Sequence, residues 1–170
     1  MRLLMPDFDG PAILEVLTRN GVDCVLIGGF GATVHGSPLL TNDVDVVPDP
    51  DATNLARLST ALYELDVKER AAELEEPLPF HHDATSPAAS RIWNLTTKFG
   101  DLDLTFVPSG TTGFADLTRD AQTVILRGTE VRLASLADIV RSKEAAGRDK
   151  DRRALPVLRE LLALQRRPPT

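Results

Sequence analysis

Cysteine is almost absent from this chain of 170 residues, which contains only Cys24. An internal disulfide is therefore excluded, and we expect a cytoplasmic protein, because a lone thiol suits a reducing compartment. Aromatic residues make up 5% of the sequence, so aliphatic side chains must fill the core. The sequence has no apolar run near the roughly 20 residues that span a bilayer and no signal-peptide pattern at its start. These absences predict a soluble protein with no membrane partner.

Two common nucleotide-binding motifs are also missing. The sequence has no Gly-Lys-Ser or Gly-Lys-Thr, so a P-loop is excluded. Gly29-Phe30-Gly31 follows an apolar run and matches the first two glycines of the dinucleotide fingerprint, but Val34 occupies the third glycine position. That glycine allows close packing of helix on strand, and valine prevents it. A Rossmann cofactor site is therefore disfavoured.

The composition, with 42% hydrophobic and 26% charged residues, is that of a globular protein. We predict one domain over residues 1–170, with a sheet-containing core at 1–134 and C-terminal helices at 135–165. The net charge of −6 is unevenly distributed, because residues 141–170 hold nine basic and four acidic side chains. This basic segment could bind a polyanion, although from charge alone an arginine-rich solvated helix face is the favoured explanation.

The order of apolar patterns predicts an α+β (mixed α/β) fold, in which a mixed β-sheet is flanked by helices. Helices are expected over 10–20, 30–35, 52–64, 135–146 and from about 152 onward. Strands are expected over 22–27, 43–47, 92–97, 102–107, 123–126 and 130–133, the last four forming two hairpins. Residues 66–90 give no clear pattern.

Closely spaced carboxylates are the main chemical signal. Asp43 and Asp45 lie two apart on a predicted strand and therefore share one face, where a divalent cation would offset their repulsion. An exposed face of an edge strand is the structural alternative. Asp103, on a later strand, would join them if the two strands are neighbours. Asp101 follows a glycine and is more typical of a turn.

Glycines and histidines offer weaker signals. Gly28 and Gly29 lie where a buried strand meets a helix, so their backbone amides could bind phosphate, although glycines often only form turns. His35 is expected to pack near these glycines. His81 and His82 could contact a substrate, but the spacing of the three histidines does not indicate a zinc site.

The combination of Gly-Gly, Asp-x-Asp about a dozen residues later and a third aspartate resembles the nucleotidyltransferase superfamily. The segment from Lys143 to Asp151 is similar to a helix-end motif of the AbiEii and MenT-type toxin branch of bacterial toxin–antitoxin systems. The resemblance covers the two ends of the chain and the GDLDL segment. One departure is Leu39, which stands where relatives often have an arginine that would contact phosphate or substrate.

The resemblance implies a transfer of NMP from an NTP to an acceptor hydroxyl, with Mg²⁺ or Mn²⁺ as cofactor. Asp43, Asp45 and Asp103 would bind metal and act in catalysis with Lys143, which would neutralise the leaving pyrophosphate. The remaining predicted nucleotide-binding residues are Gly28, Gly29, Ser37, Thr41, Arg148, Lys150 and Asp151. Without the resemblance, Lys143 would be taken as a helix lysine paired with Asp138 or Glu144.

The acceptor implied is the 3′ end of tRNA, with a cognate antitoxin as a second partner. RNA phosphates would contact the basic segment formed by Arg148, Lys150, Arg152, Arg153 and Arg159. Phosphorylation of Thr41 by a kinase-like antitoxin would place negative charge beside the acids and repel the triphosphate. Two alternatives stay open: a protein or small-molecule acceptor such as an antibiotic, and a catalytically silent nucleotide- or partner-binding domain.

Overall fold

The computed structural model describes residues 7–70, 78–79 and 92–170. Its strands form one mixed sheet in the order β4-β3-β5-β6-β2-β1-β8-β7. The strands are β1 (Cys24–Ile27), β2 (Asp43–Pro48), β3 (Lys68–Glu69), β4 (Leu78–Pro79), β5 (Ile92–Thr97), β6 (Gly100–Thr105), β7 (Gln122–Leu126) and β8 (Thr129–Leu133). The helices are α1 (Gly10–Arg19), α2 (Gly28–Val34), α3 (Ala52–Glu64), α5 (Phe114–Thr118), α6 (Leu136–Ala146) and α7 (Asp149–Gln165).

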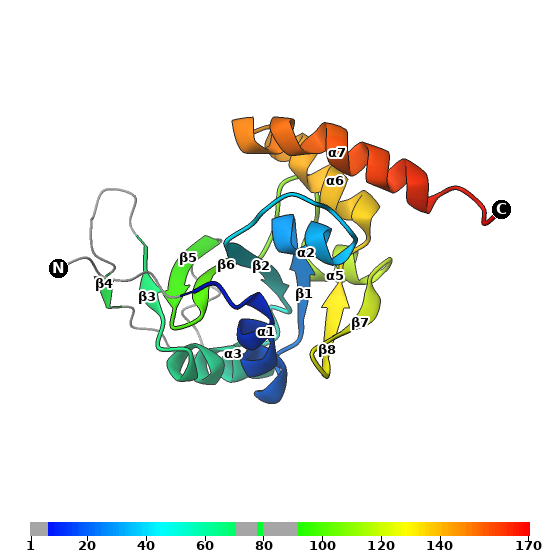
Figure 1. Cartoon of the computed structure of the whole chain (residues 1–170). Helices are drawn as coiled ribbons and strands as arrows, with labels where there is room; N and C mark the ends of the chain where they lie inside the picture. The colour runs from blue at the N-terminus through cyan, green and yellow to red at the C-terminus, as the bar shows by residue number, and fades with distance from the viewer. Residues whose placement is uncertain (1–6, 71–77, 80–91) are drawn as a thin grey trace.

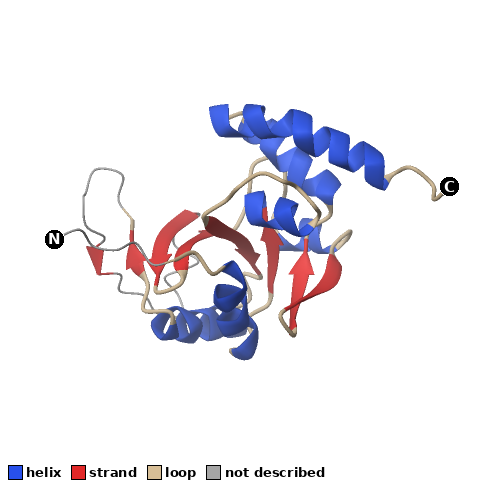
Figure 2. Ribbon diagram, in the orientation of Figure 1, coloured by secondary structure: helices blue, strands red, loops and turns tan. Residues whose placement is uncertain are grey.

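The helices cover the sheet from two sides (Figures 1 and 2). Helices α1 and α3 pack on one face, where Leu26, Val44 and Val46 belong to the same buried cluster as residues of both helices. Helices α2, α5, α6 and α7 lie on the other side, with Val25 and Val47 in their cluster. Because side chains alternate along a strand, Asp43 and Asp45 share the second side with Val47.

The predicted α+β fold is confirmed, and most predicted elements are present. Both hairpins form, β5 with β6 and β7 with β8. Helix α6 begins where the sequence indicates, because the Ser135 hydroxyl accepts a hydrogen bond from the Asp138 backbone N–H at 3.1 Å. None of the helices among the described residues is long and apolar enough to cross a membrane.

The predicted start of the last helix at about residue 152 is wrong. Helix α7 begins at Asp149, and its interior contains Pro156. The Asp151 carboxylate accepts a hydrogen bond from the Arg148 backbone N–H at 3.2 Å, which caps the free amides of the first turn. Pro156 therefore lies in the middle of the helix and does not set its start. The structure also contains helix α5, which the sequence patterns did not predict.

Candidate active site

Two parallel neighbouring strands, β2 and β6, bring the predicted acids together. Asp45 lies opposite Asp103, and Asp43 lies opposite Asp101. One side-chain oxygen each from Asp43, Asp45 and Asp103 lies within 4.8 Å of the other two. The sequence prediction depended on these strands being adjacent, and the structure has them adjacent. Val44 and Val46, which point to the opposite face, are fully buried and hold the strand rigidly in the core.

Asp101 is not a turn residue, contrary to the sequence expectation. It lies within β6, and its carboxylate accepts hydrogen bonds from the Arg70 guanidinium at 2.6 Å and from the Thr96 hydroxyl at 2.5 Å. Gly100 forms the turn with φ +114° and is also the first residue of the strand. Asp101 therefore lies beside the acidic cluster and binds Arg70, outside the set of three.

The acidic cluster is electrostatically strained. Burial, together with the charges of Asp43 and Asp103, raises the pKa of Asp45 to about 7. Burial also raises the pKa of Asp103 to about 6, although the nearby Arg70 guanidinium opposes the increase. Among the described residues, no backbone or side-chain donor binds the Asp45 carboxylate. Three carboxylates at this separation, of which Arg70 pairs with Asp103, suit a hard divalent cation, so the donor set fits Mg²⁺ or Mn²⁺.

Gly28 is required at the edge of this cluster for two reasons. Its φ of +70° is a left-handed conformation that side chains disfavour. In addition, a Cβ at this position would lie 2.2 Å from Oδ2 of Asp45. Gly29 is also closely packed, because a Cβ added at this position would lie 3.2 Å from the Thr41 hydroxyl oxygen. The glycines thus form the first turn of α2 directly against the acids.

Thr41 and Ser37 flank the same turn. The Thr41 hydroxyl donates a hydrogen bond to the Asp43 carboxylate at 2.9 Å, which orients that acid. The Ser37 hydroxyl accepts a hydrogen bond from the Leu39 backbone N–H at 3.2 Å, and Ser37 is buried at the cleft wall. Both residues therefore shape the loop between α2 and β2 that borders the cluster.

The opposite wall of the site comes from α6 and α7. The Lys143 ammonium lies 3.4 Å from the carboxylate of Asp151, a residue with 0% exposure. Arg148 Nε donates to the same carboxylate at 2.7 Å. Burial raises the pKa of Asp151, but Arg148 and Lys143 outweigh this effect and leave it lowered. The partner of Lys143 is thus Asp151, whereas Asp138 pairs with Arg141 and Glu144 pairs with Arg159.

A cleft of about 740 Å³ joins the two walls. Its lining includes every predicted site residue except Asp151, which lies beneath Lys143 and Arg148. The rim also carries four of the large exposed hydrophobic side chains of the described chain: Leu39, Leu40, Ile92 and Val107. The cleft therefore has cationic side chains on the α6–α7 wall and an apolar rim elsewhere.

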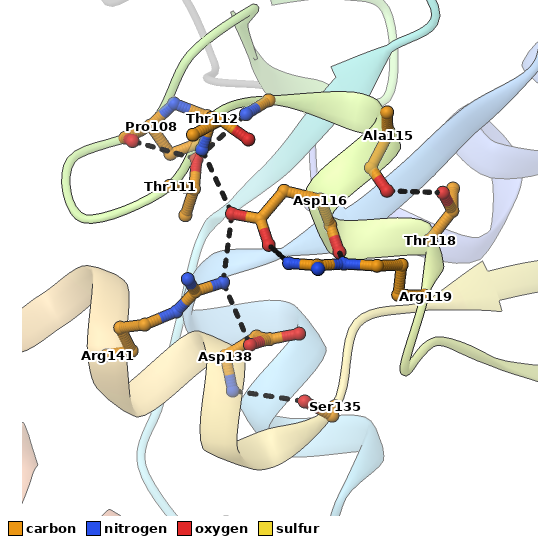
Figure 3. Close-up of polar contacts among 11 residues, drawn as sticks. Pro108, Thr111, Thr112, Ala115, Asp116, Thr118, Arg119, Ser135, Asp138 and Arg141 are labelled. Carbon is orange, nitrogen blue, oxygen red and sulfur yellow. Dashed lines mark hydrogen bonds and ion pairs between the residues drawn. The ribbon is translucent and has the colours of Figure 1, made fainter.

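A network of charged side chains holds one border of the cleft in place (Figure 3). Asp116 accepts hydrogen bonds from the Thr112 backbone N–H at 2.9 Å and from the guanidinium groups of Arg119 and Arg141. The Arg141 guanidinium also donates to Asp138 at 2.9 Å. These bonds lower the pKa of Asp116 to about 2, the Thr112 N–H having the largest effect. The network ties the loop after β6 to helices α5 and α6.

Arg70 is the site residue that sequence reasoning missed. It follows the two-residue strand β3 in a region without interpretable periodicity, and its guanidinium binds both Asp101 and Asp103. An isolated arginine in an acidic stretch carries no sequence signal for this contact. Only the pairing of β3 with β5 brings it to the cluster.

The remaining candidate side chains lie away from the acids. His35 is hydrogen bonded through Nε2 to the Ala134 carbonyl at 2.8 Å and through Nδ1 to Gln165 at 3.3 Å, so it connects α2 to α7. Burial raises the pKa of the Cys24 thiol to about 12, which excludes a reactive thiolate at neutral pH. His81 and His82 lie outside the described residues.

No protein-family model matches the sequence, and comparison with curated proteins finds no relative. Solved structures do match. A protein from Thermotoga maritima assigned to the nucleotidyltransferases shares 17% identity over 89% of each chain, with a TM-score of 0.55.

An antibiotic adenylyltransferase and an antibiotic-resistance factor also match. The lincosamide antibiotic adenylyltransferase LnuA, solved with lincomycin bound, shares 13% identity over 91% of this chain and 99% of its own, with a TM-score of 0.59. The resistance factor ANT(2″)-Ia shares 13% identity over 90% of this chain and 82% of its own, with a TM-score of 0.56. The chain therefore has the nucleotidyltransferase fold.

Proposed function

We propose that this protein is a Mg²⁺-dependent nucleotidyltransferase, which moves NMP from an NTP to an acceptor hydroxyl and releases pyrophosphate. The observation that carries the proposal is the convergence of Asp43, Asp45 and Asp103, with ligand oxygens within 4.8 Å, beside the Gly28 turn. A structural role does not account for the carboxylate of Asp45, which is buried beside Asp43 and Asp103 and accepts no hydrogen bond from the described residues, because unpaired buried charge destabilises a folded protein.

Asp43, Asp45 and Asp103 would hold the metal ion. When bound, Mg²⁺ or Mn²⁺ would neutralise the acids and the negative charge that develops on the phosphates. The backbone amides of Gly28 and Gly29, which begin helix α2 next to the cluster, would bind phosphate oxygens. Thr41 and Ser37 line the same wall and would complete the phosphate-binding surface.

The proposed chemistry is an in-line displacement at the α-phosphorus. The acceptor oxygen forms a new bond to this phosphorus, the bond from it to the bridging oxygen of the β-phosphate breaks, and pyrophosphate leaves. Asp103 would help to orient the acceptor hydroxyl as that group loses its proton to water. Lys143, held by the buried Asp151, offsets the charge of the pyrophosphate. Catalysis then consists mainly of positioning and charge neutralisation.

The first candidate acceptor is the 3′ end of an RNA, specifically tRNA, in the cytoplasm. Lys150 and Arg153 support it, because both line the cleft and neither has a carboxylate within ion-pairing distance among the described residues. Arg148, Arg152 and Arg159 are paired with Asp151, Asp149 and Glu144. An activity that modifies tRNA would suit a toxin, and the proposed second partner is a cognate antitoxin.

The second candidate acceptor is a hydroxyl of an antibiotic-like small molecule. The apolar rim formed by Leu39, Leu40, Ile92 and Val107 favours it, because a polar nucleic-acid backbone gains little from such contacts. Leu40 is fully exposed at the mouth of the cleft. LnuA was solved with an antibiotic bound, and this chain spans 99% of its length.

One labelling experiment separates these candidates. The purified chain is incubated with Mg²⁺ and each α-³²P-labelled NTP, in turn with total tRNA, with lincosamides and with aminoglycosides. Label on tRNA identifies the first acceptor, and label on a small molecule identifies the second. The label must disappear in Asp43→Ala and persist in Asp120→Asn, which removes an exposed carboxylate outside the cleft. Binding of NTP without transfer to any acceptor would indicate a catalytically silent domain and refute the proposal.

Control through Thr41 is a further part of the proposed function. A phosphate on this hydroxyl would add about −1.5 to −2 charges next to the Asp43 carboxylate, which it now contacts. NTP binding is then expected to fail. Mass spectrometry after incubation with the antitoxin tests this, and full inhibition without modification of Thr41 would exclude it.

A further inference from the structure

Arg70 bridges two acids of strand β6. Its Nη1 binds Asp101 Oδ2 at 2.6 Å, and its Nη2 binds Asp103 Oδ1. The backbone N–H of Arg70 donates to the Asn94 carbonyl at 2.9 Å, which fixes the start of the side chain on the sheet. The Thr96 hydroxyl holds the other oxygen of Asp101. The Arg70 side chain is therefore fixed both at its backbone and at its guanidinium.

The two contacts of Arg70 have different surroundings. Asp101 is not one of the three clustered carboxylates, so its ion pair serves to anchor the guanidinium. Asp103 is one of the three, and it has already committed one oxygen to Arg70. Chelation of a cation through both oxygens of Asp103 would require Arg70 to withdraw. A positive charge at this distance also lowers the affinity of the cluster for cations.

We propose that Arg70 is a positioning residue that acts as the internal counter-cation of Asp103. It orients this carboxylate toward Asp43 and Asp45 and competes with a second metal ion for it. Asp43, Asp45 and the remaining oxygen of Asp103 would then hold the first ion. This inference rests on the proposed function, because it assumes that the three acids bind metal.

A purely structural salt bridge makes the opposite prediction. If Arg70 only stabilised the sheet edge, its removal would loosen β6 and weaken metal binding. If it is the counter-cation, its removal makes the cluster more negative and strengthens metal binding. The sign of the change in affinity therefore distinguishes the two roles.

The test is titration of the nucleotide-free full chain with Mn²⁺, followed by the electron paramagnetic resonance signal of free Mn²⁺. We expect Arg70→Gln to bind Mn²⁺ at least about fivefold more tightly and to fill a second site at lower concentration, because one nearby positive charge is lost. Arg70→Lys keeps the charge but loses the bridge to two acids, so its affinity for Mn²⁺ is expected to lie between those of the native chain and Arg70→Gln. Arg127→Gln, which breaks the exposed pair of Arg127 with Asp9, is the matched control and should not change the affinity.

The outcomes separate this inference from the proposed function. Unchanged or weaker Mn²⁺ binding by folded Arg70→Gln overturns the inference. Should Arg70→Gln fail to fold, Arg70→Lys decides: tighter binding than the native chain supports the role, and equal or weaker binding refutes it. Mn²⁺ binding that survives in Asp45→Asn refutes the metal site itself, and with it the proposed function. Kinetics provide a second test. Arg70→Gln should reach its half-maximal rate at a lower Mg²⁺ concentration than the native chain, and its kcat should be reduced.

Discussion

Removing the charge of Asp45 should stabilise the metal-free protein. Burial raises the pKa of this carboxyl from its ordinary 3.8 to about 7. The folded state therefore holds more protons than the unfolded state between these values, and stability is lost as the pH rises through this window. At about 1.4 kcal/mol per pKa unit, the ionised group costs the folded state at most about 4 kcal/mol at pH 8.

Asp45→Asn keeps the size of the side chain and removes the charge. If half of the penalty is recovered, the gain of about 2 kcal/mol corresponds to a Tm increase of about 4–8 °C for a chain of this length. Mg²⁺ should raise the Tm of the native chain and leave that of Asp45→Asn unchanged, because the ion binds only an intact cluster.

The assay is thermal unfolding in EDTA at pH 8 and at pH 5, with Asp120→Asn as the surface control. The advantage of Asp45→Asn should shrink at pH 5, where the native carboxyl is largely protonated. A variant less stable than the native chain at pH 8, or a difference that is equal at both pH values, would refute the electrostatic account.

Three further predictions follow from other parts of the structure. Gly28→Ala should abolish the Mg²⁺-dependent rise in Tm, because the added Cβ would displace the Asp45 carboxylate. The matched control is Gly128→Ala, which also has a positive φ (+81°) but whose added Cβ would meet no atom within 4 Å. Asp116→Asn should lower the Tm at pH 7, and the difference should disappear as the pH falls from about 4 to about 2, since the lowered pKa of Asp116 stabilises the fold only above this range. Leu104→Ala, at a fully buried position of β6, should reduce the free energy of unfolding by about 3 kcal/mol in urea titrations. An unchanged urea midpoint in Leu104→Ala would contradict the contribution of this buried side chain to stability. A Tm difference in Asp116→Asn that persists at pH 2 would contradict the lowered pKa of Asp116.

Local patterns were sufficient to predict the acids and the elements that carry them. Alternation along β2 predicted that Asp43 and Asp45 share a face, and Val44 and Val46 are buried on the opposite face. The helix expected from residue 135 is present as α6, and the Ser135 hydroxyl caps its start. These signals persist in the structure because they depend on spacing within one element, which tertiary contacts do not change.

Contacts between distant segments could not be predicted in this way. Arg70 and Asp101 lie 31 residues apart in sequence, and only the pairing of β3, β5 and β6 makes them neighbours. Helix α7 begins at Asp149 and not at the expected residue 152, because the Asp151 carboxylate caps its first turn. That cap depends on the burial of Asp151 beneath Lys143 and Arg148.

The sequence by itself determined the types of side chain available for chemistry, their spacing on each strand and the mixed α/β class. The tertiary structure decided that β2 and β6 run parallel in register, so that Asp103 lies opposite Asp45. It also decided which charges are paired, with Arg70 on Asp103 and Lys143 on Asp151. The physical reason is that a side chain's periodicity is local, whereas its burial and its ionic partners depend on which strands and helices become neighbours.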